Sequence, residues 1–259
     1  MKTFKIGGVH PHDSKISKDC AIEDFPVLEK AYLSMAQHLG APAEPIVQKG
    51  DKVKVGQLIA KPTGFVSANI HSSVSGTVAA VEPYADLAGN PVMHVIIDVE
   101  GDEWEESIDR TPDVVRDITL SKEEIIKRIQ DCGIVGLGGA SFPTHIKLTP
   151  PPGKVAEYLL INGAECEPFL TSDYRLMIEQ PEQVLIGAKI MMKALDVKKC
   201  RFGVEENKPE AIAKLKSFSA QYPEIEIVPL KKKYPQGGEK QLIEALTGRR
   251  VPSMGLPID

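Results

Sequence analysis

The sequence has few of the features that mark membrane-spanning or metal-binding proteins. It has no run of the roughly 18–20 apolar residues that a spanning helix needs, and Met1–Gly8 has no apolar core of an export signal. Its four cysteines, at positions 20, 132, 166 and 200, form no Cys-x-x-Cys pair. We therefore expect a cytoplasmic chain, docked at most on a membrane partner, that makes no iron–sulfur or zinc site by itself.

An excess of basic residues is also missing. The chain has 31 lysine and arginine residues against 36 aspartate and glutamate residues, a formal net charge of −5. This balance disfavours a phosphate-backbone footprint, so we predict no nucleic-acid partner. One basic run, Lys231–Lys233, has two interpretations: a solvated strand end, or a contact with an anionic ligand beside the glycines that follow.

The remaining composition is that of a globular protein, and its pattern predicts two domains, 1–110 and 111–259. Hydrophobic residues make up 42% and charged residues 26% of the chain. Alternation of apolar and polar side chains marks strand-forming stretches at residues 45–60, 70–81 and 92–99. The acidic stretch 100–110, followed by Thr-Pro, has the composition of a linker or domain edge.

From residue 121 the pattern changes to helices that alternate with strands. Ser121 and Glu124 form a capping box, and Gly133 can take the positive φ that ends this helix. The further elements are a strand at 155–161, a helix at 181–195, a strand at 201–205, a helix at 209–220, a strand at 224–230, and a last helix that follows Gln236-Gly-Gly and runs to Leu246. This order predicts an α/β fold with a parallel sheet and ligands at the carboxyl ends of its strands.

Gly136-Leu-Gly-Gly-Ala-Ser-Phe-Pro-Thr-His-Ile-Lys147 is a loop whose backbone can come close to a ligand. A phosphate-binding P-loop is excluded, because the lysine lies too far past Gly139 and no hydroxyl residue follows it. The dinucleotide fingerprint fits poorly, because a third glycine is missing and the loop follows a helix instead of a strand. A purely structural turn remains open on this segment alone.

Two further loops carry groups suited to a polar ligand. Asn162-Gly-Ala-Glu-Cys-Glu-Pro168 follows a buried strand with Glu165 and Glu167, which either accept from ribose or ribityl hydroxyls or form a solvated turn. Tyr234-Pro-Gln-Gly-Gly-Glu-Lys240 places glycines before a helix, where free N–H groups and the helix dipole favour an anion. Three such loops in one α/β domain favour a ligand site.

These segments resemble those of a flavoprotein family. The stretch from Gly136 to Lys147 is similar to the FMN loop of the 51-kDa subunit of respiratory NADH dehydrogenase, and the other two loops resemble its Asn-Ala-Asp-Glu-x-Glu-Pro and Tyr-Gly-x-Gly-Glu-Glu segments. With Phe4-Lys-Ile-Gly-Gly-Val-His-Pro11, they resemble more closely the C subunits of the Rnf electron-transport complex, over essentially the whole chain.

The resemblance implies a Rossmann-like domain that binds FMN and exchanges hydride with NAD(H). It implies that FMN is surrounded by Gly136, Gly138, Gly139, Lys147, Asn162, Glu165, Gly237, Gly238 and Glu239. It also places Phe142 and Glu167 at the nicotinamide nucleotide. Ala164 and Leu148 depart from the dehydrogenase pattern, which has an acid and an aromatic residue there.

The first domain resembles the barrel-sandwich hybrid of lipoyl and biotinyl carriers. Gly50-Asp-x-Val-x-x-Gly-Gln-x-Ile and Val74-Ser-Gly-Thr-Val carry this resemblance. Those carriers need a lysine at an exposed turn between the two halves, whereas Lys61 comes too early and precedes a proline. We therefore predict a docking or structural role without an attached prosthetic group.

By the same resemblance, the chain is expected in a membrane-associated, ion-translocating ferredoxin:NAD oxidoreductase, peripheral at the cytoplasmic face. Its partners would be the other Rnf subunits and, indirectly, ferredoxin. The family continues past Asp259 with two [4Fe-4S] clusters, so we expect a carboxyl-truncated piece that could be inactive alone. The alternative function is a non-catalytic scaffold, as in the A subunit of the sodium-pumping quinone reductase; the loop from Gly136 to Lys147 favours electron transfer.

Overall fold

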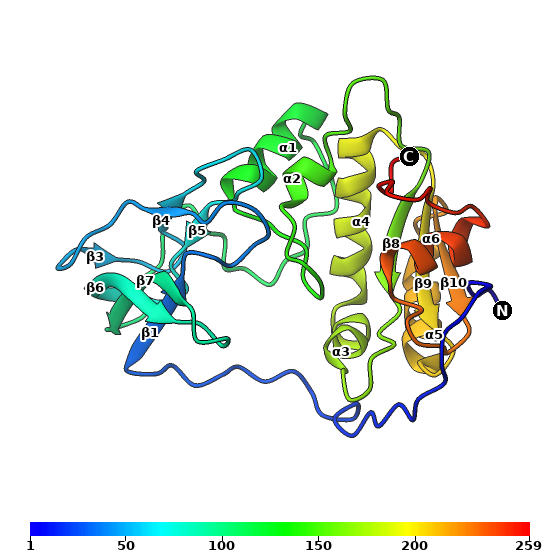
Figure 1. Cartoon of the computed structure of the whole chain (residues 1–259), viewed down its shortest axis with the longest axis horizontal. Coiled ribbons are helices and arrows are strands. Elements are labelled where there is room, and N and C mark those ends of the chain that lie inside the picture. Colours follow the sequence, from blue (N-terminus) through cyan, green and yellow to red (C-terminus); the bar gives the residue numbers. More distant parts are fainter. The chain divides into compact units, whose positions relative to one another are not determined.

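The computed structural model describes residues 1–259 as two compact units (Figure 1). The parallel-sheet unit comprises Met1–Asp24, Val114–Lys122 and Pro150–Asp259, and the barrel unit comprises Phe25–Asp113 and Glu123–Thr149. The two units interleave along the chain, because the amino-terminal residues fold with the carboxyl-terminal half. The division into domains 1–110 and 111–259 therefore stays a prediction from the sequence.

The barrel unit is built from two antiparallel sheets. Its strands are β1 (Lys30–Ser34), β2 (Glu44–Pro45), β3 (Lys52–Val53), β4 (Leu58–Lys61), β5 (Ile70–His71), β6 (Gly76–Ala85) and β7 (Pro91–Val99). They form a four-stranded sheet in the order β1-β7-β6-β3 and a three-stranded sheet in the order β2-β4-β5. The three stretches predicted from alternation all contain strands, whereas β1 lies outside the predicted stretches.

Alternation explains the core of the barrel unit. Because successive side chains of a strand point to opposite faces, every second residue can face the interior. The buried cluster consists of Met35, Ala43, Val53, Ile59, Ala60, Ile70, Val78, Val95 and Ile97. The polar neighbours of these residues face solvent, as in Lys52 and Thr77, which pair across β3 and β6.

The barrel unit also contains helices α1 (Lys122–Asp131) and α2 (Thr144–Lys147). The carboxyl end of α1 is bound by the side chain of Asn69, which donates to the Asp131 carbonyl at 3.0 Å and so satisfies a group without a helical partner. Gly133 follows with φ +64°, as predicted, and a Cβ there would lie 2.2 Å from the Asn69 carbonyl oxygen. Only glycine allows this approach.

The parallel-sheet unit confirms the predicted α/β alternation. Its strands β8 (Leu159–Gly163), β9 (Cys200–Glu205) and β10 (Ile225–Leu230) are parallel in the order β10-β9-β8. Its helices are α3 (Ser172–Glu179), α4 (Pro181–Leu195), α5 (Pro209–Ser219) and α6 (Glu239–Thr247). Helix α3 was not predicted, and the strand predicted from residue 155 begins only at Leu159.

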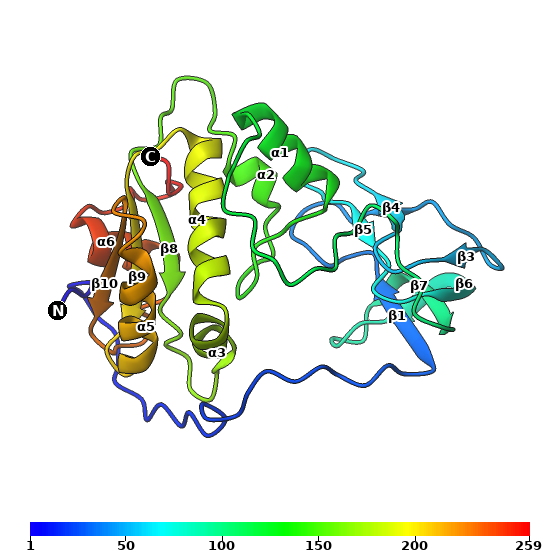
Figure 2. The same ribbon diagram turned by 180° about the vertical axis from the view of Figure 1, so that it is seen from behind.

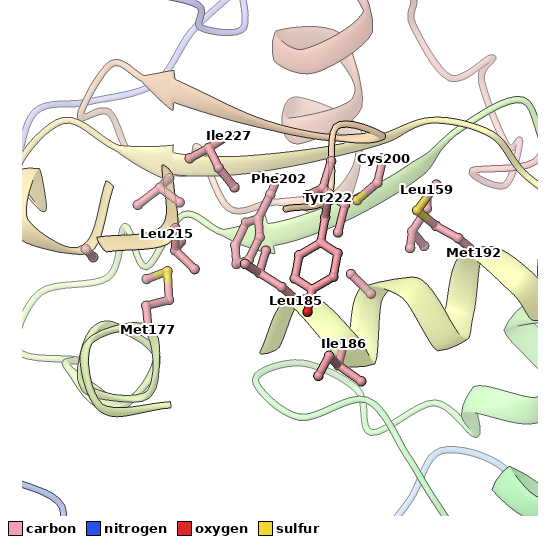
Figure 3. Close-up of a cluster of buried hydrophobic side chains, with 14 of the residues drawn as sticks. Leu159, Met177, Leu185, Ile186, Met192, Cys200, Phe202, Leu215, Tyr222 and Ile227 are labelled. Atoms are coloured by element: carbon pink, nitrogen blue, oxygen red, sulfur yellow. The ribbon is translucent and has the colours of Figure 1, made fainter. Parts of the chain in front are cut away.

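Helices cover both faces of this sheet, and α4 and α6 lie on opposite sides of it in both views (Figures 1 and 2). On one face, α3, α4 and α5 bury their apolar side chains against the strands, and Figure 3 shows Met177, Leu185, Met192 and Leu215 with Leu159, Phe202 and Ile227. On the other face, Leu242, Ala245 and Leu246 of α6 pack with Val228 and Leu230. None of the helices in the structure has the length and apolar character needed to cross a bilayer.

The amino-terminal residues extend the parallel-sheet unit. Lys2 forms a parallel bridge with Leu230 at the end of β10, and Val9 forms an antiparallel bridge with Tyr234. Phe4 between them is 2% exposed. The segment therefore contributes a core side chain to a unit whose parallel strands lie more than a hundred residues later in the sequence.

Candidate functional site at the carboxyl edge of the parallel sheet

Loops that follow the three parallel strands meet at the carboxyl edge of the sheet. We call residues 162–170, which start with the last two residues of β8, the acidic loop, and residues 234–238, after β10, the glycine turn. The side chain of Asn162 joins them: its amide nitrogen donates to the Gly237 carbonyl at 2.9 Å, and its amide oxygen accepts from the Ala164 N–H at 3.1 Å. The structure thus brings together two of the three loops that the sequence singled out.

Gly237 is needed for this close approach. A Cβ at this position would lie 2.3 Å from the Ala164 carbonyl oxygen and 3.4 Å from Cys166 Sγ. The Gly237 N–H donates to the Cys166 sulfur at 3.3 Å. The backbone of the glycine turn therefore lies directly against the acidic loop.

Glu165 is a buried carboxylate with one oxygen left free. Its side chain is 6% exposed; Oε1 accepts from the Asp173 N–H in the first turn of α3 at 2.9 Å, whereas the buried Oε2 has no partner. Burial raises the pKa of the Glu165 carboxyl, while the cations Lys208 and Lys15 act in the opposite direction. A buried acceptor without a donor is costly, so this oxygen marks where a ligand hydroxyl could bind.

Two charged residues that the sequence interpretation did not single out lie beneath the acidic loop. Glu205, the last residue of β9, is fully buried and Lys208 is 3% exposed. The Lys208 ammonium lies 3.5 Å from Glu205 Oε2 and 3.3 Å from the Glu165 carbonyl oxygen. Glu205 could have been predicted as a site residue, because it is the last residue of a strand that ends at this edge. No sequence motif around Lys208 indicates a role for it.

The remaining predicted residues of the parallel-sheet unit are more open. The Glu167 side chain is exposed in the acidic loop, and Glu239 is the exposed first residue of α6. Gly238 is the N-cap of that helix, and a Cβ there would lie 2.5 Å from Gln241 Oε1, the end of a flexible side chain.

The basic run has a structural use that neither of its two interpretations described. Lys232 donates to the Pro11 carbonyl at 2.7 Å, and Lys233 donates to the Phe4 carbonyl at 3.3 Å with its ammonium 4.0 Å from the Phe4 ring centroid. Both lysines therefore bind the amino-terminal segment, and Lys231 alone is exposed.

The glycine loop, residues 136–147, belongs to the barrel unit. A hydrogen bond closes the base of the loop, where the Gly136 N–H donates to the Phe142 carbonyl at 3.0 Å. A Cβ at Gly136 would lie 2.8 Å from Lys147 Nζ. The tip of the loop is open, because a Cβ at Gly138 or Gly139 would meet no atom within 4 Å. At Gly139, where φ is not positive, neither packing nor backbone conformation explains the glycine.

The predicted site residues thus form two groups within the two units. Gly136, Gly138, Gly139, Phe142 and Lys147 lie in the barrel unit, and Asn162, Glu165, Glu167, Gly237, Gly238 and Glu239 lie in the parallel-sheet unit. Lys147 is exposed and forms no ion pair, so its charge is available to a ligand.

Comparison with known families assigns both parts of the chain. Residues 129–259 match the model of the Nuo51 FMN-binding domain, and residues 2–102 match the RnfC barrel sandwich hybrid domain. The fold and loops are therefore those of an FMN-binding α/β domain preceded by a barrel-sandwich hybrid, and both parts of the predicted fold class are confirmed.

Two relatives match the chain over nearly its whole length. The chain is 47% identical, over 100% of its length, to the C subunit of the proton-translocating ferredoxin:NAD(+) oxidoreductase complex of Clostridium ljungdahlii, and 45% identical, over 99%, to the C subunit of the Na(+)-translocating complex of Acetobacterium woodii. It spans 56% and 58% of those two proteins. Over residues 129–259 the chain belongs to the family of Nuo51 FMN-binding domains, and over its full length it is similar to the C subunits of Rnf complexes.

A solved structure is similar over part of the chain. The NAD+-reducing [NiFe]-hydrogenase in its air-oxidized state matches 52% of this chain and 26% of its own, at 26% identity and a TM-score of 0.43.

Proposed function

We propose that the chain is an FMN-binding electron-transfer subunit that exchanges hydride with NAD(H). The observation that carries the proposal is the match of residues 129–259 to an FMN-binding domain, together with a carboxyl edge where Asn162 and Gly237 join two loops and where the acidic loop carries the free oxygen of Glu165. Enzymatic function is then that of an oxidoreductase subunit.

The donor and acceptor chemistry of the site suits FMN. The buried Glu165 Oε2 can accept from a ribityl hydroxyl, which would supply the donor that it lacks. The unpaired ammonium of Lys147 can offset the phosphate charge, and the open backbone at Gly138 and Gly139 can admit a flat ring. The other residues proposed to bind FMN are Gly136, at the base of the glycine loop, and Asn162, Gly237, Gly238 and Glu239.

Once bound, FMN would supply the hydride and single-electron chemistry, and the chain would orient it and exclude water. Phe142 and Glu167 are proposed to meet the nicotinamide nucleotide. The exposed side chain of Glu167 is free to accept hydrogen bonds from hydroxyl groups of that substrate.

The assembly is proposed from the relatives named above. We place the chain in a membrane-associated ferredoxin:NAD oxidoreductase, peripheral at the cytoplasmic face, with the other Rnf subunits as direct partners and ferredoxin as an indirect one. Electrons would pass between FMN and two [4Fe-4S] clusters outside residues 1–259.

The test is a titration with FMN, followed by flavin fluorescence and thermal unfolding. At FMN concentrations of about 100 times Kd, a site specific for the folded state should stabilise it by roughly 2.7 kcal/mol. Gly139→Glu adds bulk and negative charge at the open tip without a clash, so it should unfold like the wild type yet weaken FMN binding at least about tenfold.

Leu87→Glu is the matched control, because it adds the same acid at another fully exposed position of the barrel unit. It should bind FMN like the wild type. Absence of FMN binding by the wild type in the assembled complex would overturn the proposal and favour the non-catalytic scaffold. Saturable binding that Gly139→Glu abolishes would make NADH-dependent bleaching of the bound flavin the next measurement.

A further inference from the structure

The amino-terminal segment, residues 1–15, is fastened along its length to the loops at the carboxyl edge. The Thr3 hydroxyl donates to Gln236 Oε1 in the glycine turn at 2.9 Å, and Lys232 and Lys233 bind the carbonyls of Pro11 and Phe4. Its course is therefore fixed before the chain reaches Lys15.

Lys15 ends this segment with its ammonium group among three carbonyl oxygens of the acidic loop. Nζ lies 2.9 Å from the Glu165 oxygen, 2.8 Å from the Glu167 oxygen and 2.6 Å from the Leu170 oxygen. An ammonium group has three N–H donors, so these three acceptors use all of them. One side chain, distant in sequence, thus holds both proposed ligand-binding glutamates by their backbone.

The acidic loop needs such support, because it contains a residue in an unfavourable conformation. Phe169 has φ +71°, a value that is rare for a bulky side chain. A conformation of this kind persists only where neighbours fix it. The Phe169 N–H donates to the Asp13 carbonyl at 3.0 Å, and Lys15 binds the next carbonyl along the chain.

Lys208 does not duplicate this role. It reaches only the Glu165 carbonyl, at 3.3 Å, and its ammonium is shared with Glu205 and Asn207. Without Lys15, the carbonyls of Glu167 and Leu170 would keep no cationic donor.

We propose that Lys15 is a positioning residue of the cofactor site, which fixes the acidic loop and so the places of Glu165 and Glu167. What the loop binds rests on the proposed function; how the loop is held does not. A segment that sequence comparison groups with the barrel-sandwich hybrid would thereby shape the flavin site.

The test compares Lys15→Met with Lys18→Met. Methionine keeps the length and apolar stem of lysine and removes the donors, and Lys18 is an exposed lysine three positions on whose side chain makes no hydrogen bond. Amide hydrogen exchange in the FMN-free protein reads the loop directly, through Phe169 and through Asp173, whose N–H binds Glu165.

In Lys15→Met, exchange at these two amides should rise at least about tenfold, because hydrogen bonds to a charged group are among the stronger ones. Protection of β9 should stay unchanged, and Kd for FMN should rise by about the same factor. Lys18→Met should match the wild type in all three measurements.

Two results would overturn the inference: unchanged exchange at Phe169 and Asp173 in Lys15→Met, or a loss of protection spread equally over β9, which would make Lys15 a general stabiliser only. A wild type that fails to bind FMN would count against the proposed function, while the exchange data would still decide the role of Lys15.

Discussion

At the scale of single residues, Glu165 combines burial with an unused acceptor oxygen. Desolvation raises its pKa most strongly, and the hydrogen bond from the Asp173 N–H and the charges of Lys208 and Lys15 oppose this rise. A carboxylate in this state is poorly stabilised by the protein alone. Residues of this kind are often kept for binding at the expense of stability.

We predict that Glu165→Gln stabilises the FMN-free protein at neutral pH. Because the folded-state pKa of Glu165 is raised, its contribution to the unfolding free energy is complete below the ordinary pKa and is lost as pH rises through the folded-state value. Glutamine resembles the protonated form, so the variant should exceed the wild type by about 1 kcal/mol at neutral pH and converge with it near pH 4.

Urea unfolding at both pH values measures this difference. Glu167→Gln is the control, since that side chain is exposed, and it should leave the pH dependence unchanged. A Glu165→Gln protein less stable than the wild type at neutral pH would contradict the assignment of an uncompensated buried carboxylate.

At the scale of elements, the two glycine-bearing loops depend on their glycines for different reasons. Gly237 is required by packing, because the glycine turn lies against the Ala164 carbonyl. Gly139 has open space around it. The loops should therefore respond differently to the same substitution.

Gly237→Ala should lower the unfolding free energy by about 1–3 kcal/mol, since its methyl group would push the glycine turn away from the acidic loop. It should also disturb the bond from Asn162 and weaken FMN binding. Gly139→Ala, the matched control, should leave stability within about 0.5 kcal/mol of the wild type. Chemical unfolding of both variants tests the pair, and equal stabilities would show that the turn can move freely.

At the scale of the whole molecule, the chain enters the parallel-sheet unit twice. Residues 1–24 and 150–259 fold together, and the barrel unit is built from the chain between them. Phe4 is the buried side chain through which the first residues join that unit's interior.

Phe4→Ala should therefore destabilise the parallel-sheet unit by about 3 kcal/mol, the cost typical of deleting a buried aromatic ring. Phe25→Ala is the control, because Phe25 is 79% exposed. Hydrogen exchange read by mass spectrometry separates the units: peptides from β8 to β10 should lose protection in Phe4→Ala, and peptides from β6 and β7 should not. A uniform loss over both units would argue against their independence.

The sequence by itself determined the class of the fold and most of its elements. Local rules of periodicity, φ and N–H availability predict the helix that begins at Pro181 and the strands that end at Glu205 and Leu230. The same rules predict the glycines that end helices. The residues expected at the flavin also came from short motifs. Their ligand contacts stay predictions, although Asn162 and Gly237 do lie together, and Gly237 also contacts Cys166, the neighbour of Glu165 in sequence.

Only the tertiary structure decided how the acidic loop is held. Lys15, Lys208 and Glu205 act through contacts between segments far apart in the chain, and such contacts leave no periodic trace in the sequence. The same holds for Phe4 and for the lysines that bind its segment. Local propensity specifies what each stretch forms, whereas burial and long-range hydrogen bonding specify which stretches meet, and the proposed function depends on both.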